Sequence, residues 1–449
     1  MKLVGKAIIG IALIALSLFV SFILLADAFS LEGGPKEEWN RTFGGPYGDG
    51  FWSLQRTGDG GCILAGYTAS KAEGADLWLL RADQEGDPLW NKTFGGSGED
   101  VGYFVLETKD GGYLVTGSTD SFGMGGERLW LLKTDSRGIK EWDRIFGGFV
   151  SSSGDGGWAA EATEDGGYIV TGYTQSIGAG RKDLWLLKTD GQGNEIWDKT
   201  FGGTEDDVGM SVAGTGDEGY IVTGRTASFG SGGDDIWLLK TDSQGREEWN
   251  ATFGGKNDDA GFQVLDGGDG YALVGRTESG SDDERIVLIK TDDEGQKLWE
   301  RTYKGSAGTS LQPTSDGGFI IAGRIDSEES GRDGLLIKTD SSGRAQWATP
   351  LRGEGEDIGT WAVENSDGSY LFAGITSSYG SGAEDGWLVK FQARPMNNEE
   401  ERADNASLGA ISNSMNFTIN QSSKINMDKD KVSGKRLSNI EKIFNEKEG

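Results

Sequence analysis

Residues 165–203 read DGGYIVTGYTQSIGAGRKDLWLLKTDGQGNEIWDKTFGG, and this stretch decides the fold. It contains three blocks that recur along the chain: DGGYxVTG, which also occurs at 110–117, DLWLLKTD at Asp183–Asp190, and W-x-x-T-F-G-G. The last block recurs, with small departures, at Trp39, Trp90, Trp142, Trp197, Trp249, Trp299 and Trp347. Successive tryptophans lie 48–55 residues apart. This spacing indicates an internal structural repeat.

Each repeat predicts four short strands separated by turns. Between residues 101 and 146 the strand-like runs are VGYFVLET (101–108), GYLVTGST (112–119), RLWLLKT (128–134) and EWDRIF (141–146). Clusters of glycine, aspartate and serine separate these runs, as turn residues do. Four strands in a period near 50 residues are typical of one blade of a β-propeller, because a blade buries its two apolar faces only against other blades.

The sequence therefore predicts an all-β fold, a seven-bladed β-propeller of four-stranded blades over residues 31–392. The strand count also predicts how the ring closes. The chain enters on a strand of the tryptophan type, Trp39–Phe43, whereas no such strand follows the last block, Asp385–Lys390. We expect this N-terminal strand to complete the last blade and so to leave no free end in the ring.

A turn of the pattern D-x-x-G-x-x-x-W precedes the tryptophan in six repeats. It occurs at Asp83/Gly86/Trp90, Asp135/Gly138/Trp142, Asp190/Gly193/Trp197, Asp242/Gly245/Trp249, Asp292/Gly295/Trp299 and Asp340/Gly343/Trp347. This turn resembles the tryptophan-docking turn of quinoprotein-like (PQQ-type) propellers and, more loosely, the Asp-box turn of sialidase-like propellers. The whole repeat resembles one found in bacterial and archaeal cell-surface β-propeller proteins, over roughly residues 39–392. The resemblance implies the fold and a surface location, but not a quinone cofactor, because the adjacent cysteine pair of quinoprotein dehydrogenases is absent.

The two ends of the chain differ from the repeats. Lys2 and Lys6 precede an apolar run, residues 7–25, and the small-residue sequence Ala26-Asp27-Ala28 then precedes Phe29. Residues 1–30 are therefore predicted to be a signal peptide cleaved near Phe29 or a retained N-terminal membrane anchor. Both alternatives place the rest of the protein outside the cytoplasm, and membrane contact is expected only through residues 7–25.

Residues 393–449 lose the repeat pattern and are rich in polar residues, so we predict a disordered tail. This tail carries three N-x-[ST] sequences, at Asn405, Asn416 and Asn420, which are candidate glycosylation sites in an exported protein. The same triplet at Asn40, Asn91 and Asn250 lies inside predicted strands, where the threonine belongs to the repeat.

Composition excludes several functions. The net charge of −29 disfavours binding to anionic nucleic acid. The chain has no histidine, which excludes Ser-His-Asp and Cys-His catalysis and HExxH zinc sites. Its one cysteine, Cys62, occupies a repeat position that is Tyr or Phe elsewhere, and we expect a buried structural thiol. An enzyme would have to use carboxylates, lysine, tyrosine or a cofactor.

The best candidate site is a ring of carboxylates. Six repeats carry an aspartate just before the first strand: Asp49, Asp100, Asp155, Asp207, Asp259 and Asp357. The first strands are expected to line the central channel, so these residues would gather at one channel mouth. There they could bind Ca²⁺ or a cationic ligand, or act on a sugar as an acid and base. Alternatively, each aspartate caps its own turn by accepting backbone N–H bonds.

Seven basic residues alternate with apolar neighbours on the third strands, which favours solvated or ion-paired positions. They are Arg81, Lys133, Lys188, Lys240, Lys290, Lys338 and Lys390.

These features favour a binding or scaffolding surface over an enzyme. We expect an exported β-propeller, secreted or anchored at the cell surface, that binds a surface protein or glycan and needs no cofactor. The alternative is a carboxylate-dependent enzyme of the glycoside hydrolase type that acts on polysaccharides.

Overall fold

The computed structural model describes residues 33–393 except 71–73, 123–125, 149–153, 280–283 and 328–330. The predicted N-terminal segment 1–30, the tail from residue 394 onward and the sequons Asn405, Asn416 and Asn420 lie outside the described residues. Within the described ranges, no helix has the length and apolar character that a bilayer crossing requires.

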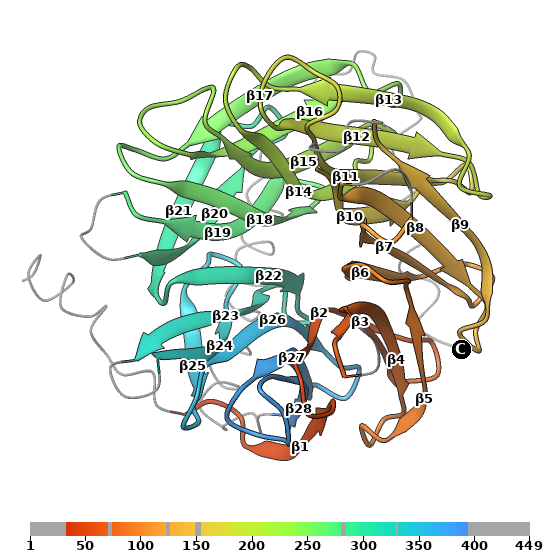
Figure 1. Ribbon diagram of the computed structural model, residues 1–449. Helices are drawn as coiled ribbons and strands as arrows, with labels where there is room; N and C mark the ends of the chain where they lie inside the picture. Colours follow the sequence, from red (N-terminus) through yellow and green to blue (C-terminus); the bar gives the residue numbers. More distant parts are fainter. Residues whose placement is uncertain are drawn as a thin grey trace, which may run out of the picture. The chain divides into compact units, whose positions relative to one another are not determined.

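Seven antiparallel sheets of four strands form a ring, and strand order within blades 1 to 6 follows the chain (Figure 1). Blade 1 consists of β2 (Asp49–Arg56), β3 (Cys62–Thr68), β4 (Asp76–Ala82) and β5 (Pro88–Phe94), and blade 2 consists of β6 (Asp100–Glu107), β7 (Tyr113–Thr119), β8 (Arg128–Thr134) and β9 (Lys140–Phe146). Blade 3 consists of β10 (Asp155–Ala162), β11 (Tyr168–Thr174), β12 (Asp183–Thr189) and β13 (Glu195–Phe201), and blade 4 consists of β14 (Asp207–Gly214), β15 (Tyr220–Thr226), β16 (Asp235–Thr241) and β17 (Glu247–Phe253). Blade 5 consists of β18 (Asp259–Asp266), β19 (Tyr271–Thr277), β20 (Arg285–Thr291) and β21 (Lys297–Lys304), and blade 6 consists of β22 (Ala307–Pro313), β23 (Phe319–Ser327), β24 (Gly331–Thr339) and β25 (Ala345–Leu351). Blade 7 consists of β26 (Asp357–Glu364), β27 (Tyr370–Thr376), β28 (Asp385–Phe391) and β1 (Glu37–Phe43). The predicted fold class is confirmed.

The predicted closure of the ring is confirmed too. Strand β1 pairs antiparallel with β28, with Trp39 opposite Lys390 and Phe43 opposite Gly386. The indole Nε1 of Trp387 donates a hydrogen bond of 2.8 Å to Asn40 Oδ1 across this pair. The first strand of the chain is therefore the fourth strand of blade 7.

Neighbouring blades share their apolar cores. In one cluster, Leu77 and Leu79 of blade 1 pack with Val115, Trp130 and Leu132 of blade 2. All five side chains are buried. Each buried residue of this kind contributes roughly 1.5–3 kcal/mol. The tryptophans and leucines of the repeat therefore hold one blade against the next, as expected.

The turn glycines explain the D-x-x-G-x-x-x-W pattern. Gly86 of blade 1 has a φ of +79°, and an added Cβ would lie 2.5 Å from the ring of Trp39, which belongs to blade 7. Each later turn repeats this contact with the tryptophan of the preceding blade. Blade 7 has no such turn, and there Gly34 of the N-terminal segment lies beside the buried Trp347. The segment before β1 thus covers the seventh tryptophan.

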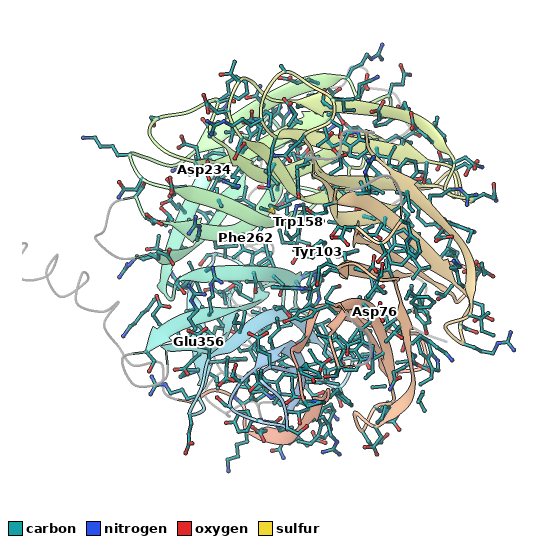
Figure 2. The ribbon with its side chains drawn as sticks, viewed as in Figure 1. Asp76, Tyr103, Trp158, Asp234, Phe262 and Glu356 are labelled. Carbon is teal, nitrogen blue, oxygen red and sulfur yellow. The ribbon has the colours of Figure 1, made fainter. Side chains whose placement is uncertain are left out.

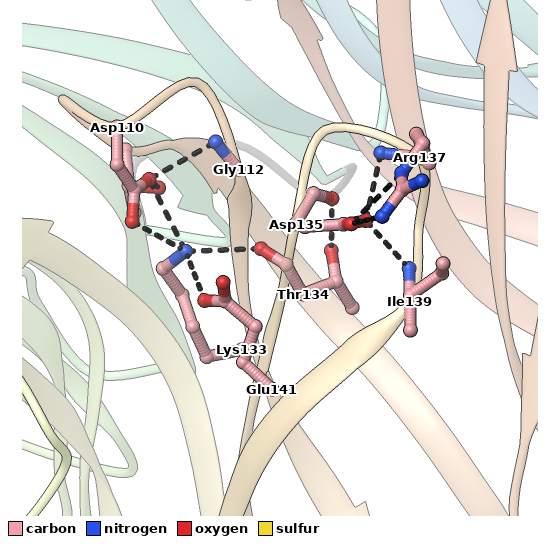
Figure 3. Close-up of polar contacts among 9 residues, drawn as sticks. Asp110, Gly112, Lys133, Thr134, Asp135, Arg137, Ile139 and Glu141 are labelled. Carbon is pink, nitrogen blue, oxygen red and sulfur yellow. Dashed lines mark hydrogen bonds and ion pairs between the residues drawn. The ribbon is translucent and has the colours of Figure 1, made fainter.

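The basic residues of the third strands are ion-paired, one of the two alternatives expected. Lys133 is 2% exposed and forms ion pairs of 3.0 Å with Asp110 and 3.1 Å with Glu141 (Figure 3). Asp110 lies in the Asp-Gly-Gly turn of the same blade. Partial burial works to raise the pKa of Asp110, but hydrogen bonds from Thr108, Gly112 and Lys133 lower it to about 2.

The antiparallel order gives the ring two different faces. Connections from a second to a third strand, and from a fourth strand to the next blade, lie on one side, which we call the loop face. The tight Asp-Gly-Gly and D-x-x-G turns lie on the other side, the turn face. Strand β1 starts and strand β28 ends at the turn face, where Gln392 N donates a bond of 2.8 Å to Lys36 O. Both described chain ends therefore leave from the turn face.

Candidate functional site

The first strand of every blade contributes to a cavity of about 580 Å³ in the central channel. Its lining comes from the later part of each strand, for example Gln55 of β2, Glu161 of β10 and Val363 of β26. Because first strands run from the loop face to the turn face, this cavity occupies the part of the channel nearer the turn face. We call it the chamber.

Each first strand also carries a β-bulge, which leaves one residue unpaired. The bulge residues are Trp52, Tyr103, Trp158, Met210, Phe262, Thr309 and Thr360. They precede the chamber residues along each strand, so they lie nearer the loop face. Tyr103, Trp158 and Phe262 lie near the centre of the ring (Figure 2).

Aromatic rings from three successive blades contact one another at these bulges. The ring centroids of Trp52 and Tyr103 are 6.5 Å apart, and those of Tyr103 and Trp158 are 4.3 Å apart. All three side chains are partly exposed. We call Trp52, Tyr103, Trp158 and Phe262 the aromatic layer. It presents flat apolar surface at the loop-face end of the channel.

Two tyrosines of second strands extend this surface. Tyr67 lies opposite Gly50 of the first strand, and its ring centroid is 6.5 Å from that of Trp52. Its hydroxyl donates a bond of 2.8 Å to Glu384 of the preceding blade. Tyr173 makes the same bond, 2.8 Å, to Glu127. Burial raises the pKa of both phenols, and the neighbouring carboxylates raise it further. Both therefore stay protonated donors that hold a carboxylate beside the aromatic layer.

Arginines take the same strand position in blades 4 to 6. Arg225, Arg276 and Arg324 lie opposite Val208, Ala260 and Ala307 of the first strands, as Tyr67 lies opposite Gly50. Blades 1 to 3 therefore present aromatic rings and tyrosine-held carboxylates at the loop-face end of the channel, whereas blades 4 to 6 each present an arginine, of which Arg225 and Arg276 are paired with carboxylates.

The six aspartates predicted as a ring start the first strands at the loop face, and all are 0% exposed. Asp207 is typical, with Oδ2 accepting 2.8 Å from Gly203 N and 2.6 Å from Ser228 Oγ, and Oδ1 accepting from Thr226 Oγ1. Comparable bonds from the same loop or the adjacent hairpin hold Asp49, Asp100, Asp155, Asp259 and Asp357. Burial raises the pKa of Asp357, against hydrogen bonds that lower it.

The observed bonds are those of the turn-capping alternative. Across the described ranges, no three acidic or thiol side chains lie close enough together to hold a metal ion. The sixth blade lacks the aspartate, and Ser306 precedes its first strand. Binding of Ca²⁺ or a cationic ligand by the six residues stays a prediction.

The chamber contains charged groups of its own. Glu161 accepts 2.8 Å from Gly214 N of the next blade, and burial raises its pKa. Glu107 accepts 3.2 Å from Gly58 N of the preceding blade. Arg56 Nη1 donates 3.1 Å to Glu364 O. These contacts join the turn-face ends of neighbouring blades, so they fix the width of the chamber.

Sequence reasoning missed the aromatic layer. Within each first strand, the position before the bulge is glycine in six of the seven blades, whereas the bulge position changes between Trp, Tyr, Met, Phe and Thr. That variation inside a regular repeat is the signal that could have identified it.

No family model matches the chain, and no curated protein matches it in sequence. Solved structures resemble it at low identity. The WD40 β-propeller domain of Doa1 is 12% identical over 80% of this chain and 97% of that chain, with a TM-score of 0.48. BBS1N, solved in complex with ARL6DN, is 12% identical over 82% and 99%, with a TM-score of 0.46. A Bacteroides caccae protein of unknown function is 13% identical over 64% and 93%, with a TM-score of 0.40. Likeness at this level concerns the fold alone.

Proposed function

We propose that the protein is an exported binding module that takes a surface glycan or protein at the loop-face end of its channel. One observation carries the proposal: residues that pack blades together repeat, whereas residues at this channel end differ from blade to blade. A residue that serves the blade is needed in every blade. Variation among the partly buried residues at this channel end is therefore what a ligand-binding surface on a regular scaffold would show.

The chemistry of this end suits recognition. The aromatic layer offers flat surface for stacking, and the carboxylates and arginines around it are fixed polar groups. Binding sites combine such a lining with a few placed polar groups that set orientation. Both described chain ends leave from the turn face, so an anchor at residues 7–25 would leave the loop face open to a partner.

The test is an array of glycans and surface proteins probed with the purified full-length protein and two variants. Trp158→Ala removes a central ring of the aromatic layer and is expected to weaken binding roughly tenfold or more, as for a central aromatic contact. Tyr47→Ala is the matched control, because Tyr47 is 64% exposed and belongs to a loop-face connection. Unchanged binding by Trp158→Ala would contradict the proposal. Release of cleaved sugar from a bound glycan would instead support the hydrolase alternative.

A further inference from the structure

A groove on the turn face separates blades 3 and 4. It has a volume of about 790 Å³, shares Glu161 with the chamber, and extends to Ile196 on the outer strand β13. Its two walls are turns that follow first strands, with Glu164 in the turn of blade 3 and Gly216 in the turn of blade 4. The groove therefore lies at the opposite face of the ring from the aromatic layer.

The missing side chain of Gly214 opens this groove. At three other blade boundaries, the last residue of a first strand or its neighbour reaches back to the turn of the preceding blade. The carboxylates and backbone N–H groups that meet there are Glu107 and Gly58 at 3.2 Å, Asp266 and Gly216 at 3.2 Å, and Glu364 and Ser315 at 2.6 Å. The first strand of blade 4 ends at Gly214, which has no side chain to make this contact with blade 3.

The fold does not require a glycine at this position. The φ of Gly214 lies outside the left-handed region, so any residue could adopt its backbone conformation. An added Cβ would lie 3.6 Å from its nearest neighbour, Glu161 Oε1, which is an ordinary contact. Since neither backbone nor packing demands this glycine, its effect is the open space beside Glu161.

A second departure from the repeat lines the same groove. Glu218 has a φ of +68°, which side chains rarely adopt. Glycine takes the equivalent turn position in five other blades, at Gly60, Gly111, Gly166, Gly317 and Gly368. Glutamate here costs backbone strain that glycine would avoid, so the exposed carboxylate of Glu218 is a feature of this groove and not of the repeat.

The lining of the groove is acidic. Its four carboxylates belong to Glu161, Glu164, Asp165 and Glu218, and its one basic residue is Lys188. Lys188 is buried, and its ammonium group is already paired with Asp165 at 2.8 Å. Among the residues that line the groove, the other three carboxylates therefore have no basic side chain to offset their charge.

The outer part of the groove is apolar. Ile196 is 55% exposed and directly precedes the repeat tryptophan of blade 3, a position where blades 2, 4 and 7 carry Glu141, Glu248 and Glu38. The next residue, Trp197, is partly exposed, and its ring centroid is 6.1 Å from that of Tyr220. The groove thus offers carboxylates toward the channel and apolar surface toward the outer strand.

We infer that this groove binds a basic, extended segment of a partner protein. Glu161 and Glu218 would hold its arginine or lysine side chains, and Ile196 would contact its apolar ones. The inference goes beyond the proposed function, because it concerns the other face of the ring. Complementary charge orients such a segment and speeds its association. Apolar surface beside the carboxylates favours a peptide, which carries both kinds of side chain, over a polyamine, which carries none.

The test measures binding of a fluorescein-labelled peptide of repeated Arg-Leu-Ser triplets to the full-length protein by fluorescence anisotropy. A matched peptide with citrulline in place of each arginine keeps the shape and removes the charge. Wild type should bind the arginine peptide about tenfold more tightly than the citrulline peptide. Glu161→Gln should weaken binding of the arginine peptide about tenfold. Glu107→Gln is the matched control, because Glu107 lines the chamber but not the groove.

Two further variants separate the groove from general attraction to an acidic protein. Gly214→Gln fills the open space without changing the net charge, and it should weaken binding about tenfold because the segment then clashes. Glu218→Gly removes a carboxylate and relieves the positive φ, so it should weaken binding roughly threefold yet melt no lower than wild type. A melting curve for each variant shows that it is folded.

Equal affinity for the two peptides, or undiminished binding by Gly214→Gln, would overturn the inference, because the attraction would then not depend on the groove. Spermine that binds as tightly as the arginine peptide, with the same dependence on Glu161, would overturn the assignment of a peptide. Trp158→Ala should leave peptide binding unchanged. Loss of peptide binding in that variant would place the peptide at the loop-face end of the channel and overturn the inference while supporting the proposed function.

Discussion

The aspartates that begin the first strands act locally. Each buried carboxylate accepts hydrogen bonds from its own loop or the adjacent hairpin, as Asp207 does from Gly203, Thr226 and Ser228. A buried acceptor that satisfies several donors fixes the loop, because each donor would otherwise be unpaired. The repetition of aspartate in six blades follows from this task, because the same loop has to be held in each of those blades.

Asp207→Asn should therefore lower the free energy of unfolding by about 1–3 kcal/mol, because a neutral amide accepts the backbone N–H less strongly and brings donors of its own. Denaturant unfolding monitored by tryptophan fluorescence measures the change. Glu205→Gln, in the same exposed connection, is the control and should change little. A rise in wild-type melting temperature in millimolar Ca²⁺ that Asp207→Asn abolishes would show that the carboxylate also holds an ion.

Among elements, a repeated ion pair joins the third strand of a blade to the turn between its first and second strands. Lys188 is 4% exposed and pairs with Asp165 at 2.8 Å in the Asp-Gly-Gly turn. Partial burial works to raise the pKa of Asp165, but hydrogen bonds from Lys188, Thr163 and Gly167 lower it to about 2. The pKa of Asp217 is lowered to about 2 by the equivalent contacts, again against partial burial.

These shifts predict acid sensitivity with a definite sign. A carboxylate whose folded pKa is depressed stabilises the fold above its ordinary pKa near 3.8, and that stability is lost as pH falls toward about 2. We expect the melting temperature to drop between about pH 4 and pH 2. Asp165→Asn should reduce that drop and lower stability at pH 7 by about 1 kcal/mol, because Lys188 loses its charged partner while solvent screens the 58% exposed carboxylate. If Asp165→Asn had the same pH dependence as wild type, this expectation would be wrong. The control is Glu164→Gln, which changes the exposed carboxylate next to Asp165.

The limits of sequence reasoning are clearest at the first strands. Residues 101–108 were expected to form a strand, and β6 spans Asp100–Glu107. Glycine turns and apolar alternation predicted such strands well, since backbone conformation and burial act locally. The bulge could not be predicted, because one extra residue changes which side chains face the channel without changing composition. Trp52 and Trp158 were therefore not grouped as one surface, and the aromatic layer was missed.

At the scale of the whole molecule, the ring depends on a strand taken from the opposite end of the sequence. Strand β1 pairs with β28, and Trp39 and Phe43 pack against the core between blades 7 and 1. Counting strands was enough to predict this, since an incomplete last blade would leave an unpaired edge. The placement of Gly34 against Trp347 was not predictable, because nothing in the N-terminal segment resembles the turn that it replaces.

Removal of residues 31–45 should open the ring. The unpaired edge of β28 and the exposed core would lower the melting temperature by about 10 °C or more and promote association. Differential scanning calorimetry and light scattering measure both effects. Removal of residues 394–449 is the control and should leave the melting temperature unchanged. An unaltered melting curve after removal of 31–45 would mean that closure contributes little to stability.

The loop-face end of the channel is the proposed binding site. The most direct test is a crystal structure of the full-length protein with the tightest ligand from the array. We expect a ligand seated against Trp52, Trp158 and Phe262, with its polar groups toward the tyrosine-held carboxylates or the arginines. A ligand bound at the turn face, or on the outer strands away from the channel, would contradict it.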